Sequence, residues 1–492
     1  MSITGLGGLS INTSEVPMPH HPFKVGLFGI GLNTYWPQFP GLEERLKGYV
    51  AQVAARLERP GVEVVNLGLI DSPLKAREAG HQLRQADVDI VFLYATTYAL
   101  SSTVLPAVQR AGVPVVILNL QPTAAIDYAS FNALGDRTKM TGEWLAYCAA
   151  CPVPEIANVF TRAGIPFHQV TGVLDGDPHV WQEVDGWLGA ARVAHVMEHG
   201  RLGVMGHYYN GMLDIYSDLT LQAIAFGTHI QIVELDELTA LRKEVGEVEA
   251  AERVQDFQRK FEVQPDCAPE ELARAARTSV ALDQFVEKHG LTSLAYYAEG
   301  TPGSDNEDVM GSVILGCSLL TARGIPVAGE YEVKNAQAMK IMDAFGAGGS
   351  FTEFYAMDFA GDVVLMGHDG PGHVGIAQGK TKVRPLAVYH GKVGSGLSVE
   401  MSVRCGPVTL LSVVEDGGSL KLLVAEGESV PGPILEIGNT NSRYRFSLGA
   451  RGFVEAWNAQ GPAHHCAVGV GHIADQISKL GALKGLRVVQ VC

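Results

Sequence analysis

Residues 24–67 read KVGLFGIGLNTYWPQFPGLEERLKGYVAQVAARLERPGVEVVNL, and they decide the fold class of the first part of the chain. An amphipathic segment, residues 42–57, lies between two short apolar runs, 24–29 and 62–67. Its apolar side chains recur at the spacing of a helix with one buried side, at Leu46, Val50, Val53 and Leu57. A strand, a helix and a second strand in this order are typical of a parallel sheet covered by helices.

The same alternation continues through the first domain and then through a second one. Two more strand-like runs, 88–93 and 113–119, complete a doubly wound α/β domain that we expect to span residues 23–180. A central α/β domain is predicted for residues 181–325, with an exposed helix over residues 237–259. Its predicted strands are 203–205, 229–235 and 293–297.

The pattern changes near residue 380, where short strands alternate with turns rich in Gly and Asp. Their regular spacing is typical of a small antiparallel barrel or sandwich. The predicted strands are 385–390, 397–404, 408–415, 419–425 and 443–448. The sequence therefore predicts an α/β fold of two doubly wound parallel-sheet domains, followed by a C-terminal antiparallel β-barrel-like domain. Residues 326–492 are assigned to this last domain, and residues 1–22 to an N-terminal extension.

Size, charge and hydropathy narrow the class of protein. A chain of 492 residues exceeds what one hydrophobic core usually organises. The 37 basic and 53 acidic side chains give a net charge of −16, which argues against binding to nucleic acid or anionic membranes. Every apolar run is interrupted before the roughly 18 residues that span a bilayer. Residues 1–22 lack a signal-peptide pattern, so we expect a cytoplasmic protein that handles small neutral molecules.

Seven cysteines are spread thinly along the chain, which favours free thiols over a disulfide framework. Cys148 and Cys151 form a CxxC motif that is compatible with redox chemistry or zinc binding. No second CxxC accompanies it, and the preceding residues 142–148 resemble a helix. We therefore interpret the pair as buried helix cysteines.

Open parallel sheets bind ligands beyond the carboxyl ends of their strands. In the first domain these ends carry uncharged polar and aromatic side chains, among them Asn33, Tyr35 and Gln121. Such groups suit a polyol substrate, and ordinary loop polarity is the alternative interpretation. Gly29 and Gly31 form only a fragment of the dinucleotide-binding fingerprint, so we predict no Rossmann cofactor site.

The loop after the central strand 203–205 should face a cleft for the same reason. It carries His207 and Asp214, either of which could reach a ligand. The alternatives are a surface histidine and a helix-capping aspartate. We include His207 with Asn33, Tyr35 and Gln121 as a predicted substrate contact.

Four side chains in the last third of the chain form a candidate metal site. Glu330 and His368 each close an apolar run, and Glu353 lies within the strand-like segment 350–355. His465 is the second of two adjacent histidines that precede another apolar run. A carboxylate in such a setting is costly to bury unless it is paired or bound to a metal. Oxygen and imidazole ligands together suit manganese, iron or zinc better than calcium.

Two carboxylates and two imidazoles leave coordination positions open for the oxygens of a sugar. A cation held there can polarise a carbonyl group. One glutamate could then remove the proton beside the carbonyl while the other returns it, as in aldose–ketose isomerisation through an enediolate. Each residue also has a structural alternative: Glu353 could pair with a buried cation, and His368 could be a satisfied core histidine.

Five short elements between about residues 325 and 470 resemble the L-arabinose isomerase family in order and approximate spacing. They are Ala328-Gly329-Glu330, the helix 334–345, Gly348 to Glu353, Leu365 to His368, and Gly461 to His465. The resemblance implies that Glu330, Glu353, His368 and His465 bind Mn²⁺ and that the two glutamates are the acid–base pair. It also implies two α/β domains, a C-terminal β domain and a homo-oligomer, commonly a hexamer with active sites between subunits. The segments 29–36 and 119–122 depart from the family pattern, at positions where the far end of the substrate would be recognised.

The predicted function is accordingly a metal-dependent isomerase of an unphosphorylated pentose, hexose or deoxyhexose. A relative of L-fucose isomerase would perform the same chemistry on another sugar. A sugar-binding or regulatory protein with two α/β lobes is a third interpretation, which explains the first 320 or so residues but not the candidate metal ligands. Stoichiometric metal in the purified protein would separate an enzyme from a binding module.

Overall fold

The structure is a computed structural model, and it describes residues 21–389 and 392–492. The predicted N-terminal extension, apart from its last two residues, lies outside the described residues. The end of the strand predicted at 385–390 also lies outside them.

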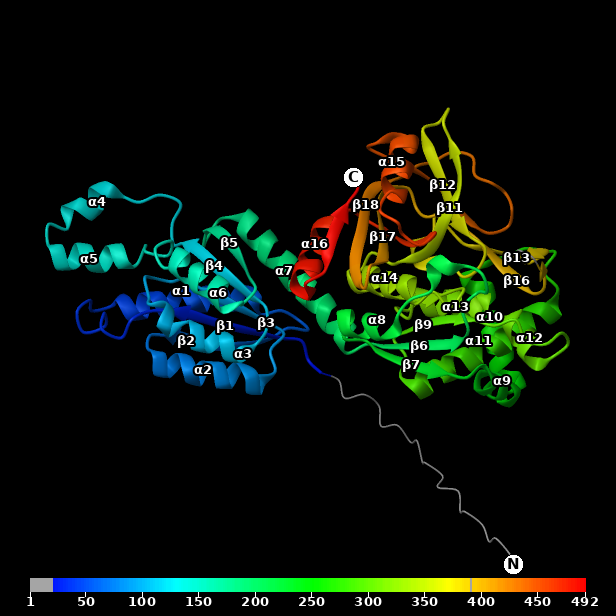
Figure 1. The fold of residues 1–492 in the computed structure, drawn as a ribbon, viewed down its shortest axis with the longest axis horizontal. Coiled ribbons are helices and arrows are strands. Elements are labelled where there is room, and N and C mark those ends of the chain that lie inside the picture. Colours follow the sequence, from blue (N-terminus) through cyan, green and yellow to red (C-terminus); the bar gives the residue numbers. More distant parts are fainter. Residues whose placement is uncertain (1–20, 390–391) are drawn as a thin grey trace, which may run out of the picture.

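The N-terminal part of the chain folds around a five-stranded parallel sheet with the order β2-β1-β3-β4-β5 (Figure 1). This order confirms the predicted parallel sheet, and helix α1 coincides with the predicted helical segment. The strands are β1 (Lys24–Ile30), β2 (Glu63–Ile70), β3 (Ile90–Tyr94), β4 (Val115–Gln121) and β5 (Phe167–Val173). The helices are α1 (Leu42–Leu57), α2 (Pro73–Ala86), α3 (Leu105–Ala111), α4 (Tyr128–Ala133), α5 (Arg137–Leu145) and α6 (Val153–Ala163).

Helix α7 (Pro178–Glu198) connects this unit to the rest of the molecule (Figure 1). Val184 and Leu188 pack into the hydrophobic core of the N-terminal unit. Val193 and Met197, near the other end of the helix, pack into the core of the following unit. One 21-residue helix therefore serves both cores.

The central unit contains a parallel sheet, again as predicted from the sequence. The order of its strands is β10-β9-β6-β7. Its strands are β6 (Arg201–Gly206), β7 (His229–Val233), β9 (Ser293–Tyr297) and β10 (Val327–Ala328), and β8 (Glu262–Val263) joins a separate small sheet. Its helices are α8 (Leu219–Phe226), α9 (Leu235–Glu244), α10 (Glu247–Lys260), α11 (Pro269–His289), α12 (Asp305–Met310) and α13 (Ile314–Ala322).

The prediction of one exposed helix over residues 237–259 is wrong, because the helix is interrupted between α9 and α10. Val245 is extended and buried, so it leaves the helical path. The backbone N–H of Gly246 donates a hydrogen bond of 3.0 Å to Glu249 Oε2 and starts a new helix. The many charged residues of this segment indicated an exposed helix, but they did not reveal that Gly246 caps a second helix within it.

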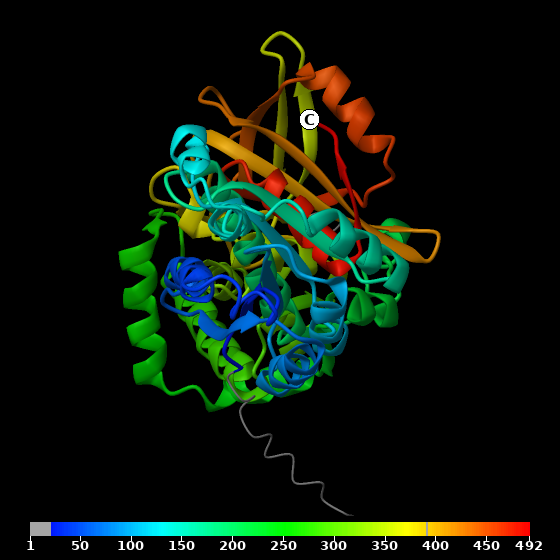
Figure 2. The same ribbon diagram turned by 90° about the vertical axis from the view of Figure 1, so that its left-hand side faces the viewer.

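The C-terminal unit is rich in antiparallel strands, as predicted, and its main sheet has the order β17-β20-β11-β12-β19-β18-β21. An additional pairing of β17 with β18 joins six of these strands into a ring. The strands are β11 (Ser350–Asp358), β12 (Val363–His368), β17 (Gly406–Asp416), β18 (Ser419–Ser429), β19 (Thr440–Phe446), β20 (His465–Val470) and β21 (Arg487–Gln490). Smaller sheets use β13 (Lys382–Pro385), β14 (Val388–Tyr389), β15 (Lys392–Val393) and β16 (Leu397–Glu400). The hairpin of β11 and β12 projects from the molecule in both views (Figures 1 and 2).

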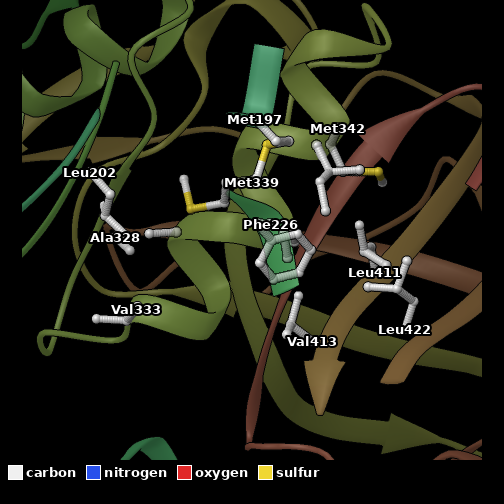
Figure 3. Packing of buried hydrophobic residues seen from close by; sticks show 14 of the residues in the cluster. Met197, Leu202, Phe226, Ala328, Val333, Met339, Met342, Leu411, Val413 and Leu422 are labelled. Atoms are coloured by element: carbon white, nitrogen blue, oxygen red, sulfur yellow. The ribbon is translucent and has the colours of Figure 1, made fainter. Parts of the chain in front are cut away.

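Three further helices are α14 (Val333–Ala344), α15 (Gly449–Asn458) and α16 (Ala474–Lys484). Helix α14 packs against both the central and the C-terminal units (Figure 3). Val333 and Met339 lie in one cluster with Leu202 of β6 and with Leu411 and Leu422 of β17 and β18. This shared core fixes the position of the segment just before α14, which contains Glu330.

The cysteines of the CxxC motif do not lie in a helix, so that part of the prediction is wrong. Helix α5 ends at Leu145, and residues 146–152 form successive turns before α6. Cys148 is buried, as predicted, whereas Cys151 is exposed. Pro152 explains the interruption, since it lacks the N–H group that a continuing helix requires.

No helix within residues 21–389 and 392–492 is both long and apolar enough to cross a membrane.

A partly buried pair, His195 and Asp89, holds α7 against the N-terminal sheet. His195 Nδ1 lies 2.6 Å from Asp89 Oδ1, and Asp89 Oδ2 accepts a hydrogen bond from the backbone N–H of Lys24 at the start of β1. The bond to Asp89 raises the pKa of His195, although burial opposes the charged form. The ring of His199 packs against the ring of His195 at 4.2 Å between centroids, and against the ring of His21 at 4.8 Å. Folding therefore favours the charged form of His195.

We predict that His195→Gln lowers the free energy of unfolding by about 1 kcal/mol more at pH 5.5 than at pH 9. Because the folded pKa is raised, the stabilisation is complete below the ordinary pKa of about 6.5 and disappears as the pH rises through the folded value. Urea unfolding at the two pH values measures the difference. His179→Gln is the control, since His179 is exposed on the same helix. Equal losses at both pH values would contradict the ion-pair account.

Candidate functional site

Glu330 lies on a backbone segment with an uncommon conformation. Glu330 and Tyr331 both have positive φ, at 58° and 62°. Non-glycine residues pay about 1–3 kcal/mol each in such regions, which persist where the surroundings hold them. The backbone N–H of Tyr331 donates to Tyr296 O of β9, and that of Tyr209 donates to Glu330 O. The turn after β10 is thus fixed from two sides, and it aims the Glu330 side chain at the C-terminal sheet.

The Glu330 carboxylate faces His465, the first residue of β20. Glu330 Oε2 lies 3.5 Å from His465 Nε2, which is too long for a good hydrogen bond. Both atoms are buried, and neither has a hydrogen-bond partner. The other ring nitrogen of His465, Nδ1, lies 2.5 Å from Glu332 Oε2. The second carboxylate therefore fixes the orientation of the imidazole and leaves Nε2 directed at Glu330.

His368, at the end of β12, approaches the same carboxylate from another strand. Its Nε2 lies 3.7 Å from Glu330 Oε1. The ring packs against Phe351 of β11 at 4.5 Å between centroids, and Phe351 also contacts the ring of His465 at 4.3 Å. One aromatic side chain therefore spaces the two imidazoles.

His464 adds a third imidazole that the sequence interpretation had set aside. Its Nε2 lies 3.9 Å from Glu330 Oε2, and its side chain is 37% exposed. Its Nδ1 lies 2.6 Å from Asp214 Oδ2, which also accepts the backbone N–H of His464 at 2.9 Å. Asp214 therefore holds His464 at the exposed edge of the cluster.

Glu353 is the fourth predicted residue, and it lies beside the cluster on β11. In the register of β11 and β20 it is directly opposite His465, so the two side chains are on the same face of the sheet. Glu353 also lines a pocket of about 340 Å³ together with Asp214, His464 and Trp457. The pocket therefore gives a small molecule access to Glu353 and to the exposed edge of the cluster.

The donor set fits a divalent cation. Ligand atoms of Glu330, His464 and His465 lie within 4.8 Å of one another. Two atoms that bind one ion at about 2.1 Å are about 3–4 Å apart, which is close to the spacings around Glu330. The arrangement of Glu332, His465 and Glu330 also matches the carboxylate–histidine pattern that orients metal ligands. A cation would satisfy both Glu330 Oε2 and His465 Nε2, which have no partner in the protein.

Burial and charge affect the titration of these groups in different directions. Burial alone would raise the pKa of Glu330, but the neighbouring imidazoles, His368 foremost, hold that pKa below its ordinary value. Burial lowers the pKa of His465 well below the ordinary value, which favours the neutral ring that binds metals. Burial raises the pKa of Glu332 to about 8.

Comparison with known proteins agrees with this geometry. Residues 348–487 match the family model of the L-arabinose isomerase C-terminal domain. L-arabinose isomerase 1 of Bacillus licheniformis is 22% identical over 344 residues, which cover 68% of this chain and 69% of that protein. The L-arabinose isomerase of Klebsiella pneumoniae is 23% identical over 325 residues, or 62% of this chain and 64% of that protein. That of Shewanella baltica is 23% identical over 330 residues, or 63% of each.

The chain is thus similar in sequence to L-arabinose isomerases, at 22–23% identity. The model of their C-terminal domain covers Glu353, His368 and His465, while Glu330 precedes the matched region. Packing around α14 brings Glu330 to His368 and His465. The similarity and the geometry of the cluster therefore concern the same part of the molecule.

The predicted substrate contacts are distributed over two units. Asn33 and Tyr35 follow β1, and Gln121 ends β4, so all three lie at one edge of the N-terminal sheet. Within one chain, α7 and α16 separate this sheet from β11 and β12 (Figure 1). His207 is exposed and follows β6, two residues before the Tyr209 N–H that contacts Glu330 O. The structure therefore brings only His207 near the cluster, and the substrate role of all four residues stays a prediction.

Sequence reasoning missed Glu332 as a partner of His465 and did not assign Asp214 to His464. Glu332 is two residues after Glu330, and this pair of nearby carboxylates was the available signal. Asp214 is 250 residues from His464, so no spacing in the sequence indicated their contact.

A larger pocket of about 770 Å³ lies elsewhere, between α1, α7 and α16. Its lining includes Arg56, Trp181 and Asp475 but no histidine. We assign the chemistry to the smaller pocket, because that one contains Glu353 and adjoins the unpaired ligand atoms.

We predict that Glu332→Gln weakens binding of a divalent cation by about 10–100-fold, because glutamine cannot ionise to the carboxylate that accepts the His465 Nδ1 proton and leaves Nε2 free to bind. Isothermal titration with Mn²⁺ measures the change. His207→Gln is the control and should leave the affinity as it is, since His207 Nδ1 donates to Tyr208 O and not to the cluster. Unchanged affinity in Glu332→Gln would contradict the orienting role.

Proposed function

We propose that this protein is a metal-dependent aldose–ketose isomerase that acts on an unphosphorylated sugar. The observation that carries the proposal is the pair of unpartnered buried atoms, Glu330 Oε2 and His465 Nε2, beside a pocket that contains Glu353. The distant relationship to L-arabinose isomerases supports the same reaction class.

Manganese is the proposed cation, held by Glu330, Glu353, His368 and His465. When bound, the cation would polarise the carbonyl group of the sugar and stabilise negative charge on its oxygen. Neutral His465 offers Nε2 as a ligand atom because Glu332 occupies its Nδ1. The mixed set of carboxylates and imidazoles agrees with manganese, iron or zinc.

The proton transfer is assigned to Glu330 and Glu353. One carboxylate removes the proton from the carbon next to the carbonyl, and the other returns a proton to the neighbouring carbon through an enediolate. Such a shuttle needs one carboxylate that is ionised at neutral pH. The lowered pKa of Glu330, against which burial acts, agrees with that requirement.

The pocket supports a small, uncharged substrate. Its volume of about 340 Å³ is near the lower end of small-molecule sites. Asp214, Glu353 and Asn458 provide oxygen and amide groups for hydroxyls, and Trp457 and Phe354 provide apolar contact. No Lys or Arg is among the described residues that line it, although phosphate sites usually use such cations. An L-arabinose-like pentose, a hexose or a deoxyhexose therefore fits better than a sugar phosphate.

A homo-oligomer with sites between subunits is part of the proposal. The polar strand-end residues Asn33, Tyr35 and Gln121 are remote from the cluster within one chain, so they would serve it only across a subunit boundary (Figure 1). A hexamer and a cytoplasmic location are proposed from the resemblance to the family.

We predict that the purified protein with Mn²⁺ converts at least one unphosphorylated aldose to its ketose, and that Glu330→Gln and Glu353→Gln each lower kcat by at least about 1,000-fold, as loss of an acid–base group does. A panel of pentoses, hexoses and deoxyhexoses, assayed for ketose formation, measures the activity. Removal of the metal with a chelator should abolish turnover, and added Mn²⁺ should restore it.

Glu400→Gln is a matched control, because Glu400 pairs with Lys382 and Arg384 outside the cluster. It should retain full activity for the same sugar. Near-normal turnover in Glu330→Gln and Glu353→Gln, or no ketose from any sugar with manganese, iron or zinc, would contradict the proposal.

A further inference from the structure

The CxxC motif lies in a setting that the proposed isomerase chemistry does not use. Residues 146–148 continue beyond α5 in tight turns, with Ala146 N–H donating to Glu143 O and Cys148 N–H donating to Leu145 O. Residues 148–151 also lie in turns. The end residues of a four-residue turn have Cα atoms less than about 7 Å apart, which overlaps the range of about 4.4–6.8 Å that a disulfide spans.

Cys151 and the backbone N–H groups of Tyr98 and Cys151 lie close enough to the Cys148 thiol to act on its pKa. Cys148 is 5% exposed, whereas Cys151 is exposed to solvent. One sulfur is therefore accessible to a reagent, and the other is held beneath it.

We infer that Cys148 and Cys151 form a reversible disulfide, which makes this turn a redox modification site. The co-reactant is a small disulfide such as oxidised glutathione. The Cys151 thiolate attacks one of its sulfurs, and the first small thiolate leaves. The Cys148 sulfur then attacks Cys151 in the mixed disulfide, and the second small thiolate leaves. Two cysteine thiols are oxidised, one small disulfide is reduced to two thiols, and the two cysteine protons go to the leaving thiolates.

The chemistry assigns different roles to the two cysteines. Burial, reinforced by contact with Cys151, raises the pKa of the Cys148 thiol to about 12. Only the thiolate is nucleophilic, so accessible Cys151 attacks the small disulfide first and Cys148 is a slow resolving residue. Disulfides of this kind in reducing compartments are usually transient and regulatory.

The turn is connected to the strand-end loops of the N-terminal sheet. Thr97 Oγ1 donates a hydrogen bond of 2.7 Å to Leu145 O, and the backbone N–H of Tyr98 is near enough to the Cys148 thiol to act on its pKa. Tyr35 lies close enough to both cysteines for their charges to act on its hydroxyl. Closing an S–S bond of about 2.05 Å draws the sulfurs together and away from their present contacts. The disulfide should therefore change the conformation of residues 95–98, which follow β3 at the same edge of the sheet as Asn33 and Gln121.

Mass spectrometry of the intact, folded protein tests the inference. After equilibration with oxidised glutathione and blocking of free thiols, residues 140–162 should be recovered as one peptide that has lost two hydrogens and carries no blocking group at Cys148 or Cys151. Dithiothreitol should reverse the change. Cys151→Ser should abolish it, while Cys405→Ser, which removes an exposed cysteine in another unit, should not.

Amide hydrogen exchange provides a second measurement that needs no enzymatic turnover. Oxidation should change the exchange of residues 95–98 in the original protein and leave it unchanged in Cys151→Ser. Three results would overturn the inference: free thiols at both positions, a stable glutathione adduct on Cys151, or a disulfide between two chains. Since none of these measurements uses a sugar, their outcome is independent of the proposed isomerase activity.

Discussion

The structure of the candidate site depends on how the buried Glu330 carboxylate is neutralised. An ionised carboxylate away from water costs several kcal/mol unless charge or hydrogen bonds compensate it. Here the nearest groups are three imidazoles. Their Nε2 atoms lie 3.5 Å (His465), 3.7 Å (His368) and 3.9 Å (His464) from the carboxylate oxygens of Glu330. None of these distances is a good hydrogen bond, and Glu330 Oε2 remains without a partner. A cation in their midst would remove the cost for all four groups at once.

Other parts of the molecule position these groups. The left-handed backbone at Glu330 and Tyr331 is stabilised by β9 and by the loop after β6. The shared core around α14 places this turn against β20 and β12 (Figure 3). Glu332 and Asp214 then each fix one histidine, at 2.5 Å and 2.6 Å. The central and C-terminal units therefore build the site together.

Local patterns in the sequence predicted the elements that depend on local physics. Helix α1 was placed at its observed bounds, because its apolar residues repeat with helical spacing and face one core. Strands β1 to β4 of the N-terminal sheet and β6, β7 and β9 of the central sheet were found within a few residues, since they are short runs rich in apolar residues. Strands β5 and β10 were not predicted. The break at Val245 and the turns at Cys148 were missed, because each depends on a single cap or proline within an otherwise helical pattern.

The candidate site was only partly accessible from sequence. Glu330, Glu353, His368 and His465 were found because each carries a polar group at an unusual place in an apolar segment. Glu332, Asp214 and His464 were not assigned their roles, since contacts between residues as far apart as 214 and 464 exist only in the folded chain. The remote position of Asn33 and Gln121 could not be foreseen either, because it depends on the length and path of α7.

The most direct test of the account is the position of a bound manganese ion in crystals, located by anomalous scattering. The account predicts one strong peak within about 2.0–2.4 Å of ligand atoms from Glu330 and His465, with Glu353 and His368 completing the set. A peak bound elsewhere on the chain, or a Glu330 carboxylate that stays without metal at saturating Mn²⁺, would contradict it.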